Sequence, residues 1–153
     1  MESVFRSHAG ELWRAVLATT AGRADIADDV TAEAFSRLLV YDKGVRDPVA
    51  WLFRTAFRLA AAELRREALL SPPVQVERGR RDRAAFLSDD LTDALRLLTP
   101  AQRSVVFLHY HADLPVSEVA ARTGSSVPAV KVRLHRARRA LRGRMQTEEV
   151  AGE

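Results

Sequence analysis

The chain has 153 residues, 47% of them hydrophobic, with a formal net charge of +4 and no cysteine. This composition suits one or two small domains with real cores, and it excludes disulfides, thiol catalysis and cysteine-bound metals. We find neither an apolar run long enough to cross a bilayer nor a signal-peptide pattern, so the expected location is the cytoplasm, without membrane insertion.

The charge is unevenly distributed along the chain. Residues 1–45 carry five basic and seven acidic side chains, residues 46–88 nine and five, and residues 89–145 ten and five. An acidic start followed by two basic segments predicts two kinds of partner, a protein surface first and a polyanion afterwards.

The first 40 residues predict two helices separated by Gly22. The first runs from about residue 4 to 20, and the second begins near residue 25. Asp28, Asp29 and Glu33 gather towards the start of the second helix, where the helix dipole favours carboxylates. Capping and solubility would explain them, and so would an acidic docking face for a basic partner helix.

A loop over residues 41–48 precedes a third predicted helix, from about residue 49 to 67. Its arginines alternate with Phe53 and Phe57, a pattern that fits melted nucleic acid because bases stack on rings while the backbone seeks positive charge. The alternative is that these aromatic rings belong to the core. Residues 68–86 contain two adjacent prolines and a charge run, which predicts a flexible linker.

The last third of the chain predicts a helix-turn-helix. Thr99 and Gln102 form a capping box at the start of one helix, and a short helix then ends at Gly124, a residue suited to a left-handed turn. Ser126 can cap the basic helix that follows, whose apolar positions recur every three or four residues. This order of elements places the last helix in a DNA major groove.

The face opposite the apolar stripe of the basic helix would contact DNA. Arginine suits the two acceptors of guanine, a valine suits the thymine methyl group, and the flanks would meet phosphates. The candidates for base and groove contacts are Lys131, Val132, Arg133, His135, Arg136 and Arg139. The candidates for backbone contacts are Ser126, Arg138 and Arg142.

Four motifs together resemble one family. They are D-D-V-x-x-E-A-F in the second helix, W-L-F-R in the third, L-T-P-A-Q-R, and V-K-V-R-L-H-R-A-R-R-A-L in the basic helix. The chain is similar from about Ser7 to Met145 to the bacterial sigma-70 family, in particular to the short extracytoplasmic-function sigma factors. The resemblance implies an all-α fold of two small helical domains joined by a flexible linker, and no enzymatic activity or cofactor.

The resemblance also implies partners and residue roles. Residues 1–67 would bind core RNA polymerase and the −10 promoter element, residues 68–86 would be the linker, residues 87–146 would read the −35 element, and residues 147–153 would form an acidic tail. Asp28, Asp29 and Glu33 match positions that engage the clamp helices of the largest polymerase subunit. The helix from Pro100 to Ala112 matches the surface that meets the flap of the second-largest subunit, and an anti-sigma factor is a conceivable inhibitory partner. The candidates for the melted −10 strand are Tyr41, Lys43, Arg46, Trp51, Arg54, Arg58, Arg65 and Arg66.

The chain departs from the family pattern where the family often has polar side chains. The departures are Ala32, Arg58, Ala62, Ala129 and Val132. The last two remove hydroxyl groups from the basic helix, which points to a different promoter sequence. None of the five removes a positive charge.

Three other functions compete with this interpretation. A stand-alone regulator would need the helix-turn-helix but neither the acidic helix nor the tryptophan helix. An enzyme would rest on His109 and His111, which point about 200° apart on a helix and so cannot share a metal. A peripheral membrane protein is disfavoured because caps and glycines divide the chain into short packed helices.

Overall fold

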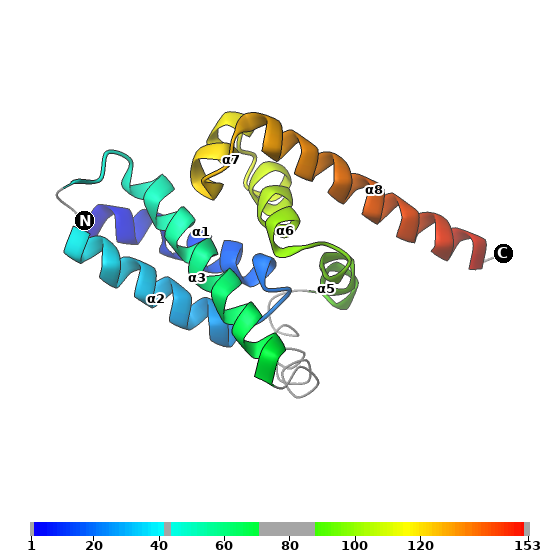
Figure 1. Cartoon of the computed structure of the whole chain (residues 1–153), viewed down its shortest axis with the longest axis horizontal. Helices are drawn as coiled ribbons and strands as arrows, with labels where there is room; N and C mark the ends of the chain where they lie inside the picture. Colours follow the sequence, from blue (N-terminus) through cyan, green and yellow to red (C-terminus); the bar gives the residue numbers. More distant parts are fainter. Residues whose placement is uncertain (1, 42–43, 71–87, 152–153) are drawn as a thin grey trace.

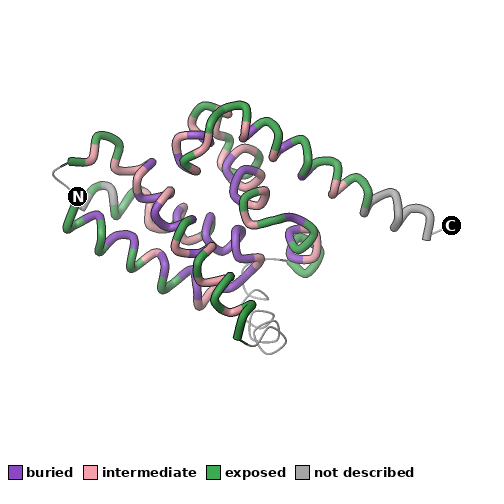
Figure 2. Tube along the Cα trace, in the orientation of Figure 1, coloured by how far each residue is buried: buried purple, intermediate pink, exposed green. Residues whose placement is uncertain are grey.

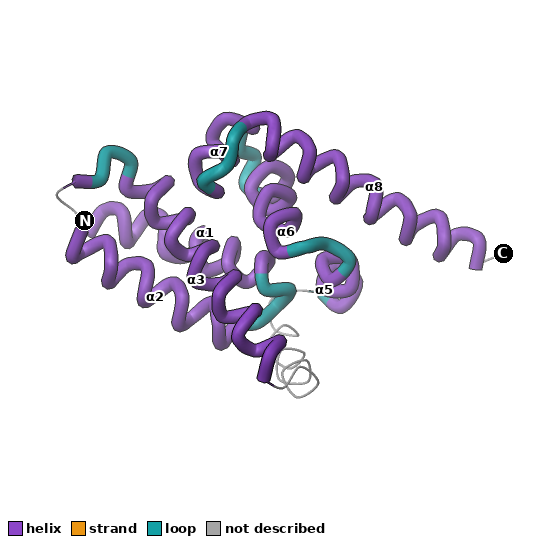
Figure 3. The backbone as a smooth tube through the Cα atoms, in the orientation of Figure 1, coloured by secondary structure: helices purple, strands orange, loops and turns teal. Residues whose placement is uncertain are grey.

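The computed structural model describes residues 2–41, 44–70 and 88–151, and all regular structure within them is helical (Figures 1 and 3). The all-α prediction is therefore confirmed. In chain order the elements are α1 (Glu2–Thr19), α2 (Ala24–Tyr41), α3 (Pro48–Leu70), α5 (Asp89–Arg96), α6 (Pro100–Val106), the π-helical turn η2 (Phe107–His111), α7 (Val116–Thr123) and α8 (Val127–Ala151).

Helices α1, α2 and α3 pack against one another around a shared apolar core. Leu12, Leu38 and Phe53, one from each helix, are fully buried there, and Phe57 is 9% exposed. The stacking role considered for Phe53 and Phe57 is therefore wrong, and the alternative is correct. Both phenylalanine rings are buried against other helices, so they are not available to stack on bases.

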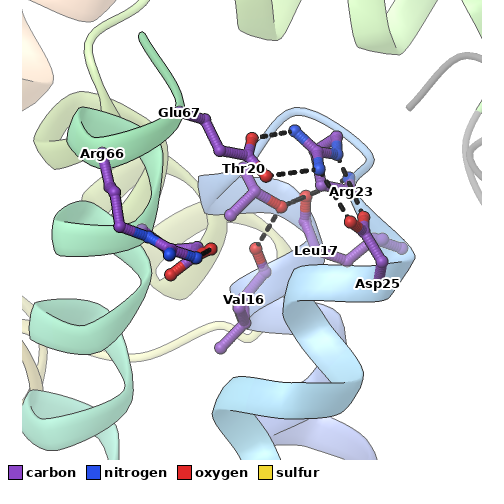
Figure 4. Close-up of polar contacts among 8 residues, drawn as sticks. Val16, Leu17, Thr20, Arg23, Asp25, Arg66 and Glu67 are labelled. Atoms are coloured by element: carbon purple, nitrogen blue, oxygen red, sulfur yellow. Dashed lines mark hydrogen bonds and ion pairs between the residues drawn. The ribbon is translucent and has the colours of Figure 1, made fainter. Parts of the chain in front are cut away.

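The turn between α1 and α2 is tied to the far end of α3 by Arg23 (Figure 4). Its guanidinium donates hydrogen bonds to the Asp25 carboxylate at 3.0 and 2.7 Å and to Glu67 Oε1 at 2.9 Å. Burial alone would lower the pKa of Arg23, but these two carboxylates outweigh it and raise the pKa. The cluster therefore joins the α1–α2 turn to the last part of α3.

The predicted signals of the second half are confirmed by its geometry. The Thr99 and Gln102 side chains make both bonds of a capping box at the start of α6, and Gly124 ends α7 in the left-handed region with φ 68°. The Ser126 hydroxyl accepts from the Ala129 backbone N–H at 3.2 Å, at the start of α8. A Cβ on Gly124 would lie 3.1 Å from Cδ of Arg54, so space as well as backbone geometry favours glycine.

Two helix ends differ from the prediction. Helix α3 continues to Leu70 rather than stopping at Glu67, so residues 68–70 are helical although they were assigned to the linker. Helix α8 continues to Ala151, through most of the segment expected to be a separate tail. Alanine, leucine and glutamate favour helix, so neither segment contains a residue that would stop it. The rest of the predicted linker, residues 71–86, lies outside the described residues.

The two groups of helices pack directly against each other. Helix α7 lies along α3, and α6 lies against α1, so that buried residues from both halves form one continuous core cluster. Figure 2 shows buried residues on the facing sides of both groups, while the second half of α8 extends away from the rest.

Candidate nucleic-acid interface

Helix α8 presents the predicted base-reading face to solvent. Val130, Leu134 and Ala137 on the opposite stripe are buried, at 0 to 3% exposure, so the helix cannot turn without losing its core contacts. No carboxylate occurs between Val127 and Gly143, so the exposed face carries positive charges and no negative one. The exposed residues on this face are Lys131, Val132, His135, Arg136 and Arg139.

The flanks of α8 are partly held by hydrogen bonds to neighbours. Arg138 donates to the Tyr110 hydroxyl at the surface, and the half-buried Arg133 donates to the Ser125 hydroxyl. Arg142 is exposed. The Ser126 hydroxyl accepts from the backbone at the helix start, and it retains its own O–H for a phosphate.

A second basic and aromatic site lies where α2 leads into α3. Tyr41, Arg46, Trp51 and Arg54 line an open cavity of about 580 Å³. The Tyr41 and Trp51 ring centroids are 6.5 Å apart, and Tyr41 is 62% exposed. Two rings beside two guanidinium groups are the combination that holds a single strand, by stacking and by charge. Lys43, predicted with this group, lies outside the described residues.

The remaining arginines predicted for this strand do not join that cavity. Arg58 is exposed and lines a separate cavity of about 370 Å³. Arg65 and Arg66 lie some fourteen residues beyond Trp51, or about 20 Å along the helix. Arg66 is hydrogen-bonded to Glu63 at the surface. The residues predicted to bind the melted strand therefore form two groups. Four of them line one cavity, and the other arginines are spread along α3 outside it.

The acidic residues of α2 form an exposed face well away from α8. Asp28 accepts a hydrogen bond from the Trp13 indole N–H at 2.7 Å, and Glu33 pairs with Arg37 at 2.9 Å. Asp29 is exposed and has no ion pair among the residues that the structure describes. An exposed pair of the Glu33–Arg37 kind is worth about 0.3–0.5 kcal/mol, so Glu33 can exchange partners readily.

Two arginines at the contact between the two groups of helices, one buried and one partly buried, were not predicted. Arg122 of α7 is 8% exposed, and Arg103 of α6 donates to the Leu95 carbonyl oxygen at 2.7 Å and to the Thr19 carbonyl oxygen at 3.0 Å. Burial, with a smaller effect of the Arg96 charge, lowers the pKa of Arg103 to about 10. Neither residue stands out in a chain this rich in arginine, because one partner of each, Glu11 for Arg122 and Thr19 for Arg103, lies in the other half of the sequence.

The structure supplies no basis for metal chemistry at the two histidines. His109 Nδ1 is hydrogen-bonded to the Leu114 carbonyl oxygen at 2.9 Å, while the His111 ring stacks on Phe107 at 4.8 Å between centroids. Within residues 2–41, 44–70 and 88–151 we find no group of three side chains placed to hold a metal ion. Across the same ranges, none of the helices has the length and apolarity needed to span a membrane.

Comparison with known proteins gives consistent matches along the chain. Residues 88–141 match the family model for sigma-70, region 4. The chain is 32% identical over 146 residues to the RNA polymerase sigma-E factor of Streptomyces antibioticus, covering 93% of this chain and 73% of that protein. It is 31% identical over 159 residues to the ECF RNA polymerase sigma factor SigL of Mycobacterium tuberculosis, covering 95% and 89%.

A solved structure has a similar fold. It is the sigma factor RpoE in complex with the anti-sigma factor NepR from Bartonella quintana, with a TM-score of 0.67 and 19% identity. The similarity covers 95% of this chain and 96% of that one, and at this identity it supports the arrangement of helices alone.

Proposed function

This chain belongs to the extracytoplasmic-function group of the sigma-70 family, and from that premise we propose that it binds core RNA polymerase and directs initiation from promoters with −10 and −35 elements. The observation that carries the proposal is the separation of three surfaces on one chain. These are the exposed basic face of α8, the aromatic and basic cavity beside α3, and the acidic face of α2.

The face of α8 would read the −35 element in the major groove. Arg136 and Arg139 project from the side opposite the buried stripe, where bidentate bonds to guanine are available. Val132 offers only methyl groups and is 46% exposed, which suits a thymine methyl. Ser126, Arg138 and Arg142 would hold the flanking phosphates, because they lie on the flanks and at the start of the helix. Arg133 was predicted for base and groove contacts, but it is half-buried and bonded to Ser125, so we assign it to a phosphate as well.

The cavity beside α3 would hold the melted −10 strand. Tyr41 and Trp51 supply rings for one or two unstacked bases, and Arg46 and Arg54 supply charge for the adjoining phosphates. Arg58, Arg65 and Arg66 continue the positive charge along α3, in the direction that a strand leaving the cavity could follow.

The acidic face of α2 would dock on the clamp helices of the polymerase. Asp29 and Glu33 are exposed and one helical turn apart, so both can reach a single basic partner helix. The surface around α6 would meet the flap. We also propose that residues 1–67 and 87–146 act as two units, one for each promoter element.

This assignment makes the protein a cytoplasmic initiation factor with no catalytic activity of its own. A partner that inhibits it is expected, since the related RpoE was solved with an anti-sigma factor. The competing interpretation, a stand-alone regulator, would leave the acidic face of α2 without a role.

The test is run-off transcription with core polymerase on a library of promoter fragments. The chain should programme initiation from a subset that shares two elements, and the Asp29→Lys/Glu33→Lys variant should lose polymerase association while keeping its helical circular dichroism. Glu148→Lys/Glu149→Lys, with the same change of charge near the C-terminus, should still associate. Specific DNA binding without any association with polymerase would favour the stand-alone regulator instead.

A further inference from the structure

The cavity of about 370 Å³ lies where α3 meets the start of α6 and the turn between α7 and α8 (Figure 1). Three guanidinium groups line it, from Arg54 and Arg58 of α3 and from Arg133 of α8. The described residues that line it include no carboxylate. The cavity therefore gathers three positive charges without a negative one.

These three arginines are not neutralised within the described part of the chain. Arg23 and Arg122 each bind two carboxylates. By contrast, Arg54, Arg58 and Arg133 form no ion pair with any residue that the structure describes. Arg54 and Arg58 lie four residues apart on one face of α3, where like charges repel each other. An anion bound in the cavity would relieve that repulsion and accept strong, charge-assisted hydrogen bonds.

Hydrogen-bond donors remain on these groups. An arginine carries five N–H donors. Arg54 donates from Nη1 to the Ala121 carbonyl oxygen at 2.9 Å, and the half-buried Arg133 donates from Nη1 to the Ser125 hydroxyl. Since the Ser125 hydroxyl accepts in that bond, its own O–H is left for a ligand. The two bonds restrict the arginine side chains before anything binds, which lowers the cost of binding.

Part of the lining is apolar. Phe57, Ala61, Pro100 and Ala101 contribute hydrocarbon surface beside the arginines. The volume lies within the range of cavities that hold small organic ligands, roughly 300–1,000 Å³. An anion that carries an organic group would use this surface, whereas a bare phosphate ion would not.

We propose that this cavity binds an organic diphosphate of the nucleoside diphosphate class. The diphosphate would lie among Arg54, Arg58 and Arg133, with its organic part against the apolar side of the cavity. A diphosphate suits the site better than a monophosphate, because each phosphoryl group can accept a bidentate pair from a separate guanidinium. Its charge is also closer to that of the three arginines.

A bound diphosphate would compete with promoter DNA, an effect that rests on the proposed function. That function assigns Arg54 and Arg58 to the −10 strand and Arg133 to a phosphate beside the −35 element. The ligand would occupy the same donors and so lower the affinity of the chain for DNA. The acidic face of α2 contributes nothing to this cavity, so association with polymerase would be unaffected.

Calorimetric titration of the full chain with ADP tests the site without DNA or polymerase. We expect ADP to bind once per chain, AMP to bind at least fivefold more weakly, and adenosine not to bind. Arg58→Ala/Arg133→Ala should weaken ADP binding at least tenfold. Arg65→Ala/Arg136→Ala is the matched control, because it removes two exposed arginines of the same helices that lie outside the cavity, and it should bind like the wild type.

Two results would overturn the site, namely no binding of ADP to the wild type and an equal loss in both double variants. Equal affinities for ADP and AMP would overturn the diphosphate assignment. Circular dichroism of each variant would establish that the helical fold is retained.

A carboxylate placed in the cavity provides a test that removes no arginine. Ala101 is exposed and lines the cavity from the first turn of α6, where the helix dipole favours glutamate. Ala101→Glu should abolish ADP binding, whereas Ala68→Glu, at an exposed position of α3 outside the cavity, should not. ADP should raise the melting temperature of the wild type and of Ala68→Glu but not of Ala101→Glu, because a ligand of the folded state stabilises it. Undiminished ADP binding by Ala101→Glu would contradict the proposed site.

Competition with DNA is measured separately, by fluorescence anisotropy of a labelled −35 duplex and a labelled −10 single strand. Saturating ADP should lower the affinity of the wild type for both several-fold, and adenosine should have no effect. DNA binding that is unchanged by bound ADP would overturn the competition. A chain that binds ADP as expected but cannot initiate with core polymerase would contradict the proposed function and leave the diphosphate site standing.

Discussion

Replacing Arg23 by alanine should destabilise the first half of the protein substantially. The Arg23 side chain is 9% exposed, and it is paired with Glu67 at 15% and Asp25 at 37% exposure. Removing one partner from a buried pair costs about 3–5 kcal/mol, because the other partner is left buried and unpaired. Since Asp25 keeps substantial access to water, we expect the lower end of that range.

A loss of about 3 kcal/mol corresponds to a fall in melting temperature of roughly 6–12 °C for a chain of this size. Thermal and urea unfolding followed by circular dichroism would measure it. Arg66→Ala is the matched control, because Arg66 lies one residue from Glu67 on α3 but makes its ion pair with Glu63 at the surface. If Arg23→Ala and Arg66→Ala had the same melting temperature, the cluster would not be holding α3 to the α1–α2 turn.

Three further predictions concern the DNA surfaces and pH. Arg136→Ala should cost about 1–3 kcal/mol of promoter binding and relax preference at one −35 position, whereas equal weakening on every sequence would mark Arg136 as a phosphate contact. Trp51→Ala should weaken capture of the melted strand by about 1–3 kcal/mol for each stacked base, visible as lost permanganate reactivity of −10 thymines, and unaltered reactivity would remove Trp51 from the strand site. Burial alone would raise the pKa of Asp25, but the hydrogen bond and charge of Arg23 hold it below 3.8, so this carboxylate's contribution is complete above that pH and is lost as the pH falls further. Acid titration of unfolding should therefore show a flatter profile for Asp25→Asn, and an identical profile would contradict this coupling.

Local signals in the sequence predicted the helix-turn-helix well. A capping box, a left-handed glycine and a serine cap each act within a few residues, so the pattern of residue types is enough to recognise them. The exposed face of α8 followed for the same reason, since helical geometry alone sorts residues into a buried stripe and its opposite.

Helix α3 was harder to interpret because two of its faces are apolar. One face packs on α1 and α2, and a neighbouring face receives α7, so periodicity could not separate core rings from exposed ones. Phe53 and Phe57 proved to be core, while Trp51 is half-buried beside the cavity. The number of helices that pack against a given helix depends on the tertiary fold, and the sequence of that helix alone does not reveal it.

The contact between the halves was not predicted at all. Arg122 and Glu11 are separated by 111 positions, and each also fits an ordinary surface helix. In a chain with so many arginines, the presence of one more does not indicate whether it is buried in a contact or exposed at the surface. Only the three-dimensional arrangement distinguishes the few that are buried from those that face solvent.

Gly124 limits how freely the halves of this protein could be exchanged with those of a relative. Its backbone needs a residue without a side chain, and the space beside it is already filled by the methylene groups of Arg54. A chimera that joined this helix-turn-helix to another first half would therefore have to match the residue at position 54 as well as the junction. Exchange of halves between this protein and a relative is therefore constrained by two residues seventy positions apart, Arg54 in the first half and Gly124 in the second.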